Sequence, residues 1–224
     1  MIIKKYILSV FFSLICLNSF SQLPNGFVYV SDIIADLDVE LRYNTSNNFI
    51  GNQIIGYQTN KLILTIETAN ALKQVQETLQ EQNLCLKVYD GYRPQQAVSH
   101  FVEWAKNLND TINKSKFYPN VNKRNLFKEG YISSKSGHSR GSTIDLTIID
   151  GNTGIPLDMG SPYDFFGKES WVNFENITKK QKTNRELLQK VMINNGFRNY
   201  PKEWWHFTLR WEPFPNTYFD FPVK

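Results

Sequence analysis

Two short segments of the chain hold residues that can bind a metal ion. In "SGHSRGSTID", six residues separate His138 from Asp145, and "EWWH" places Glu203 three positions before His206. Two imidazoles and one carboxylate can fill three positions of a tetrahedral zinc site and leave the fourth for water, as in catalytic zinc sites. These residue types predict one Zn²⁺ per chain, held by His138, Asp145 and His206.

Glu203 is the remaining acid in these segments. Water in a zinc site has a pKa of about 7, and a nearby carboxylate can take its proton during attack and pass it to a leaving amine. We therefore predict that Glu203 is a general base and acid. Arg93, in "YDGYRP", is a candidate for stabilising the negative charge of the transition state, because a tight turn between a strand and a helix would hold it.

Each of these signals is weak when it is taken alone. Arg93 by itself is more typical of a surface ion pair, and the two tryptophans between Glu203 and His206 are more typical of a core or a site wall than of a cofactor box. We expect Trp204 and Trp205 to wall the site. The third histidine, His100, has no partner pattern and is interpreted as an ordinary histidine on a helix face.

The surrounding pattern predicts the elements that must position these residues. Apolar residues at helical or alternating spacing favour helices over 66–82, 94–106 and 186–195 and strands over 84–90, 142–150 and 203–211. In the strand 142–150, Ile144, Leu146 and Ile148 face one side and Asp145 faces the other. An unpaired buried carboxylate is costly, and a cation opposite Asp145 would remove that cost.

Residues 107–130 are polar and have no clear period, yet Phe117, Tyr118 and Phe127 must pack somewhere, so we expect an ordered excursion over the surface. The order of helices and strands, without a glycine-rich phosphate loop, predicts an α+β fold. The expected architecture is a single domain with a central, mostly antiparallel sheet flanked by helices, and with the zinc site on the sheet.

The N-terminus is typical of a secretory signal peptide. Lys4 and Lys5 precede an apolar run, and small residues follow it, so we expect residues 1–21 to be removed and residues 22–224 to form the exported domain, periplasmic or secreted. No stable membrane insertion is expected after cleavage. The formal net charge is +4, of which two charges belong to this leader, so a nucleic-acid partner is not expected. Cys85 is then the single thiol, which excludes an intrachain disulfide.

Three motifs together resemble a known family. "YDGYRP", "SGHSRGSTIDLT" and "EWWHF", in this order, are similar to the zinc D-Ala-D-Ala dipeptidases of the vancomycin-resistance type. The likeness extends through "VELRYNTSNNF", "MGSPYDFF" and "WEPFPNTYFDFPVK", and so covers nearly the whole chain after the leader. The resemblance implies zinc ligation by His138, Asp145 and His206, catalysis by Glu203, and transition-state stabilisation by Arg93.

The resemblance also implies that Tyr43, Ser136 and Asp164 bind the charged ends of a small dipeptide substrate. A carboxylate such as Asp164 in a closed pocket suits the ammonium of a free dipeptide, although an acid in "SPYDFF" can also serve as a turn residue. Export favours wall-peptide turnover or dipeptide scavenging. Two alternatives stay open: a D,D- or L,D-carboxypeptidase or endopeptidase acting on peptidoglycan stems, and a zinc-containing module that binds wall peptides without cutting them. The sequence does not indicate the oligomeric state.

Overall fold

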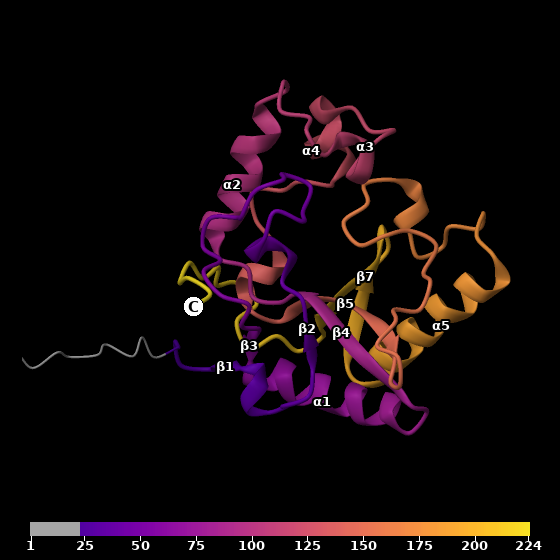
Figure 1. Ribbon diagram of the computed structural model, residues 1–224. Helices are drawn as coiled ribbons and strands as arrows, with labels where there is room; N and C mark the ends of the chain where they lie inside the picture. Colours follow the sequence, from indigo (N-terminus) through magenta and orange to yellow (C-terminus); the bar gives the residue numbers. More distant parts are fainter. Residues whose placement is uncertain (1–22) are drawn as a thin grey trace, which may run out of the picture.

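The computed structural model describes residues 23–224 and has a five-stranded sheet at its centre (Figure 1). The signal peptide predicted for residues 1–21 lies outside the described residues. The strand order is β2-β4-β5-β7-β6, in which β2 pairs parallel to β4 and every other pair is antiparallel. The prediction of an α+β fold with a mostly antiparallel sheet is therefore confirmed. The strands are β2 (Asp38–Val39), β4 (Leu84–Asp90), β5 (Thr143–Asp150), β6 (Phe197–Tyr200) and β7 (Glu203–Leu209).

Two long helices cover one face of this sheet. Helix α1 (Ile66–Gln80) packs on β4, and α5 (Lys179–Asn194) packs on β6, β7 and the side of α1. The alternation predicted for β5 is confirmed, since Ile144, Leu146 and Ile148 are fully buried in the core and Asp145 points to the opposite face. Burial of these branched side chains fixes the register that presents Asp145.

A second group of helices lies beyond the other face, at the top of Figure 1. It contains α2 (Gln95–Lys106) and the short helices α3 (Lys114–Phe117) and α4 (Leu126–Glu129). The excursion expected over 107–130 is ordered: Phe117 and Tyr118 are buried. The expectation that Phe127 packs is wrong, because its ring is 43% exposed while Leu126 beside it is buried.

Helix α5 begins seven residues before the predicted start at Glu186. A capping box explains the difference: Thr178 Oγ1 accepts a hydrogen bond from Gln181 N, and the Gln181 side chain accepts one from Thr178 N. The first turns are polar and therefore show no hydrophobic period. Five short 3-10 helices complete the fold: η1 (Val30–Asp32), η2 (Arg42–Asn44), η3 (Lys123–Asn125), η4 (Gly137–Arg140) and η5 (Lys168–Ser170).

The C-terminal segment packs beside a separate two-stranded sheet, formed by β1 (Phe27–Tyr29) and β3 (Ile63–Thr65). Its aromatic rings close around Phe27, and we call this set the Phe27 cluster. The members of the cluster are Phe27, Tyr92, Phe214, Phe219 and Phe221. The C-terminal segment thus completes an aromatic core beside this small sheet.

Within residues 23–224, the structure has no helix that is both long and apolar enough to cross a membrane. Cys85 lies half-buried on β4 and is a free thiol.

Candidate active site

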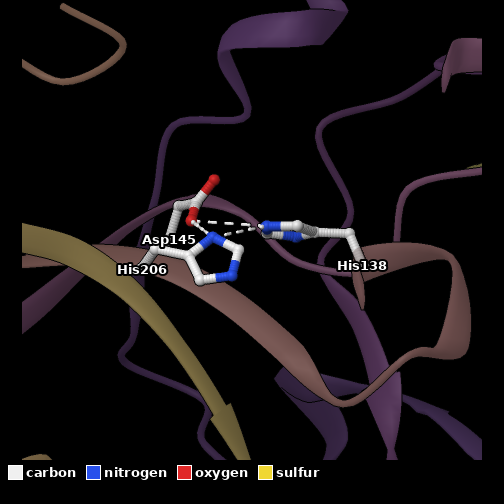
Figure 2. A group of neighbouring side chains, drawn as sticks. All are labelled: His138, Asp145 and His206. Atoms are coloured by element: carbon white, nitrogen blue, oxygen red, sulfur yellow. Dashed lines mark hydrogen bonds and ion pairs between the residues drawn. The ribbon is translucent and has the colours of Figure 1, made fainter. Parts of the chain in front are cut away.

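A row of ionisable residues crosses three neighbouring strands of the central sheet. In the strand register, Asp90 of β4 lies opposite Asp145 of β5, and Asp145 lies opposite His206 of β7. His138, on η4, reaches the same point from the side (Figure 2). The fold therefore brings the three predicted metal ligands together from segments up to 68 residues apart.

An irregularity in β7 explains why the side chains of Glu203 and His206 lie on the same face of the sheet. Side chains three positions apart on a regular strand point to opposite faces. Here Tyr200 pairs with Glu203 while the preceding Asn199 pairs with Phe207, so residues 204–206 form a bulge that has no counterpart on β6. The bulge turns both Glu203 and His206 toward one cavity, as bulges near active sites often do.

The two tryptophans of this bulge do not line that cavity, so the expectation that they wall the site is wrong. Both rings are buried. The Trp204 indole nitrogen donates to Ser161 Oγ, and the Trp205 ring packs edge-on against Tyr163. The Tyr163 hydroxyl donates to Asp145 Oδ2 over 3.2 Å, so Trp205 supports the site through one intermediate ring.

Three atoms converge at the metal site predicted from the sequence (Figure 2). Asp145 Oδ1 lies 3.0 Å from His206 Nδ1 and 3.3 Å from His138 Nε2. His138 Nδ1 is 2.7 Å from the Gly91 carbonyl, which can only accept, so Nδ1 carries the proton and the Nε2 lone pair faces the site. Asp145 Oδ1 is buried and accepts no hydrogen bond. A cation between these donors would satisfy it, so the residues fit a metal ion.

The electrostatics of Asp145 and His138 favour the forms that bind metal, whereas His206 favours its protonated form. Burial opposes ionisation of Asp145, but the neighbouring imidazoles outweigh burial and lower the pKa of its carboxyl. Burial lowers the pKa of His138, which keeps that imidazole neutral. Burial also disfavours the charged form of His206, yet the Asp145 carboxylate beside it raises the pKa of His206. A bound cation would replace this proton.

Glu203 and Arg93 lie beside the three ligands. Glu203 Oε2 is 3.3 Å from His206 Nδ1, and burial raises the pKa of the Glu203 carboxyl, as suits a general base. Arg93 donates from Nε and Nη2 to Asp90 Oδ2, each over 2.8 Å, and its Nη2 is 3.5 Å from Asp145 Oδ2. This places a fixed guanidinium next to the metal site.

Asp90 is a site residue that the sequence reasoning missed. It is fully buried, accepts from the Tyr57 hydroxyl over 2.6 Å, and lies 3.4 Å from His138 Nδ1. Burial raises the pKa of its carboxyl despite the nearby Arg93. The sequence signal that could identify Asp90 is its position at the end of a buried strand, three residues before Arg93.

The predicted substrate-binding residues line the same cavity as the metal ligands. The Tyr43 hydroxyl donates to Asp164 Oδ2 over 2.9 Å, and both side chains are buried. Burial raises the pKa of Asp164 well above its ordinary value. Asp164 has φ 61°, a left-handed conformation that is rare for a non-glycine residue and typical of strained functional sites. Ser136 Oγ accepts from His138 N at the start of η4.

All eight residues predicted for the site line one cavity of about 260 Å³, which we call the inner cavity. His100 lies elsewhere and accepts a hydrogen bond from Ile55 N, as expected of an ordinary histidine on a helix face. The remaining wall of the inner cavity is largely apolar. Its apolar and aromatic lining comprises Phe49, Val98, Phe101, Tyr131, Ile132, Phe166 and Tyr200. The cavity combines a metal-competent centre with a buried carboxyl opposite, as a small zwitterion requires.

Comparisons with known proteins place the chain in a peptidase family. Residues 24–224 match the model of a peptidase family described as D-ala-D-ala dipeptidase. The D-alanyl-D-alanine dipeptidase of Enterococcus faecium is 40% identical over 199 residues, covering 89% of this chain and 98% of that protein. The D-alanyl-D-alanine dipeptidase of Streptomyces coelicolor is 36% identical over 201 residues, covering 90% and 100%. Among solved structures, a VanY D,D-pentapeptidase in complex with Zn(II) has a TM-score of 0.42 and 15% identity, covering 79% and 82%.

Proposed function

Because the chain belongs to the D-Ala-D-Ala dipeptidase family of peptidases, we propose that its inner cavity hydrolyses D-Ala-D-Ala to two molecules of D-alanine. The chain is a hydrolytic dipeptidase of this family. The observation that carries the assignment to this cavity is that all eight residues predicted from the family motifs line it, although they come from separate strands, turns and loops.

We propose Zn²⁺ as the bound metal, held by His138 Nε2, Asp145 Oδ1 and His206 Nδ1. Two nitrogens and one carboxylate oxygen are a donor set that suits zinc with an open fourth position, and the buried, unpaired Asp145 Oδ1 supports a cation here. When bound, zinc lowers the pKa of water and polarises the substrate carbonyl.

The residues of the chain supply the proton transfers and the charge stabilisation. Glu203 accepts a proton from the attacking water as the new C–O bond forms. It donates that proton to the leaving amine as the C–N bond breaks. The Arg93 guanidinium, fixed by Asp90, stabilises the negative charge that develops on the carbonyl oxygen. Burial raises the pKa of Glu203, which makes its carboxylate a stronger base than an ordinary one.

Three further residues of the cavity orient the substrate. Asp164, held by Tyr43, is the partner for the ammonium group of the dipeptide, and the Ser136 hydroxyl is available to its carboxylate end. A charged ammonium in this buried position would stabilise the ionised form of Asp164, which burial alone disfavours.

Release of D-alanine tests this function. The mature protein should release D-alanine from D-Ala-D-Ala faster than from a pentapeptide stem that ends in D-Ala-D-Ala, because the inner cavity is small and has an acid for a free ammonium. Release from the stem alone would instead identify a carboxypeptidase. Tight binding of the dipeptide without release, in zinc-loaded protein, would identify a binding module.

We also propose that the chain is exported and acts on dipeptides in the periplasm or outside the cell. The support is the run of Lys4 and Lys5, apolar residues and small residues before the matched region, which begins at residue 24. Expression of the full chain, followed by mass spectrometry of the extracytoplasmic fraction, should find a mature protein that starts after about Ser21. A protein that retained Met1 would contradict export by this route.

A further inference from the structure

A second cavity of about 490 Å³ lies beside the inner cavity, and we call it the outer cavity. Tyr131 lines both cavities. Its neighbour Gly130 lines the inner cavity, and Glu129 lines the outer one. In the same way, Phe166 lines the inner cavity and Gly167 the outer one. The two spaces therefore share one thin wall, made of Glu129–Tyr131 and Phe166–Gly167.

This wall is held in place by specific contacts. The Tyr131 ring stacks on Phe166, with centroids 5.1 Å apart and planes 16° apart. Lys202 Nζ, on the turn between β6 and β7, donates to the Glu129 carbonyl over 2.7 Å. Phe166 N donates to Phe117 O over 2.7 Å. The wall is thus tied to both the sheet and the helices above it.

Part of the wall is close to the residue proposed to bind the substrate's amino group. Phe166 follows Asp164 by two residues, and both line the inner cavity. A peptide extended beyond its second D-residue would grow from the amino group toward Tyr131. The inner cavity, at about 260 Å³, is smaller than the roughly 300–1,000 Å³ of ordinary ligand pockets and leaves little other room.

We propose that Tyr131 is the residue that restricts this enzyme to dipeptides, by closing the inner cavity off from the outer one. The proposal deepens the function proposed above and rests on it. Removal of the ring joins the two cavities and gives an N-terminal extension a place to lie. The outer cavity would then hold the N-terminal residue of a longer peptide, and one aromatic ring sets the restriction.

The test compares Tyr131→Ala, which removes the ring, with Tyr131→Phe, which keeps the stacking on Phe166. For each zinc-loaded variant, kcat/KM is measured for L-Ala-D-Ala-D-Ala and for D-Ala-D-Ala. The tripeptide-to-dipeptide ratio should rise at least fivefold in Tyr131→Ala and stay within twofold of wild type in Tyr131→Phe. The ratio cancels effects on the proton transfer, since Glu203 serves both substrates. A rise below fivefold in Tyr131→Ala would overturn the proposal.

A binding measurement separates this proposal from the proposed function. In zinc-loaded Glu203→Gln protein, calorimetry gives the Kd of the tripeptide and of the dipeptide with and without Tyr131→Ala. The ratio of the tripeptide Kd to the dipeptide Kd should fall at least fivefold when Tyr131→Ala is added. An unchanged ratio would refute the role of Tyr131 in closing the inner cavity off from the outer one, even if the wild type released no D-alanine. If Tyr131→Ala does not fold, Lys202→Met, which removes the tie to Glu129, should shift the same ratios, with Lys202→Arg as the control that keeps a donor.

Discussion

The inner cavity and the Phe27 cluster meet at two adjacent residues and differ in almost every physical respect. Tyr92 stacks on Phe221 at 4.0 Å between ring centroids, within the cluster. Arg93, the next residue, is bound to Asp90 in the cavity wall. One region buries apolar rings in contact with each other, and the other buries several charged or polar groups. A single turn after β4 supplies one residue to each region.

The difference shows where stability and function reside. Burial of aromatic rings contributes directly to folding, whereas burial of carboxylates is costly unless each one is paired. Asp90, Asp145 and Asp164 are 0%, 2% and 6% exposed. A fold that needed only stability would replace these acids with apolar residues. Asp145 and Asp164 line the inner cavity and Asp90 holds Arg93 beside it, so their presence is best explained by chemistry, and variants in the two regions should separate activity from stability.

The largest expected effect is on catalysis in the cavity. Glu203→Gln removes the proton acceptor and should lower kcat for D-Ala-D-Ala by about 10²- to 10⁴-fold. Zinc content and melting temperature should be unchanged, or the melting temperature slightly raised, because a buried charge is removed. Steady-state kinetics, elemental analysis and thermal unfolding check these points. A Gln variant within tenfold of wild type would remove Glu203 from the mechanism.

The matching experiment in the other region is Phe27→Ala. Phe27 contacts four aromatic rings, so the cavity left by its loss should lower the free energy of unfolding by about 3–5 kcal/mol. Denaturant titration measures this change, and Phe27→Leu, which fills more of the space, should lose less. Below the unfolding transition, kcat/KM should stay near the wild-type value. A stable variant with lost activity would contradict the separation of the two regions.

Adjacent substitutions give the sharpest form of the comparison. Arg93→Lys keeps a positive charge but loses the paired hydrogen bonds to Asp90, and it should lower kcat by about 10²-fold with little change in stability. Tyr92→Phe loses the hydrogen bond from its hydroxyl to Phe221 O and should cost about 1 kcal/mol of stability with kcat unchanged. If both variants lost activity equally, the turn would act as one unit and the two regions would not be separable.

The smallest effect concerns pH and the amino end of the substrate. Burial raises the pKa of Asp164, so its protonated form persists to higher pH than in an ordinary carboxyl. The substrate ammonium pairs with the ionised form, so KM for D-Ala-D-Ala should fall as pH rises through this elevated pKa, up to about pH 7.7, where amino groups begin to deprotonate. Asp164→Asn should raise KM about tenfold and flatten this dependence. A pH-dependent KM that persists in the Asn variant would assign the titration to another group.

The sequence predicted the parts of the site that depend on local pattern. The alternation of Ile144, Leu146 and Ile148 places Asp145 on the opposite face of β5. The short motifs identify His138, Glu203 and His206 as candidate site residues. The strands that are long and strongly patterned were found almost to the residue, because periodicity is strong there.

Features that depend on tertiary contacts were not predictable in this way. The bulge in β7 is set by pairing with Asn199 and Tyr200, so the burial of Trp204 and Trp205 away from the inner cavity could not be deduced from their neighbours in sequence. Asp90 lies within "YDGYRP", but only the pairing of β4 with β5 places it opposite Asp145. Tyr131 directly follows the polar segment 107–130, and the position of the wall is fixed by contacts with Phe166 and Lys202, which lie far away in sequence.

The central claim is that the cavity at His138, Asp145 and His206 hydrolyses D-Ala-D-Ala with a bound metal. The most direct measurement is the release of D-alanine from D-Ala-D-Ala by the purified mature protein, before chelation, after removal of metal, and after one equivalent of Zn²⁺ is restored. The account predicts release that is lost with the metal and returns with zinc. Release that persists in metal-free protein, or no release in zinc-loaded protein, would contradict it.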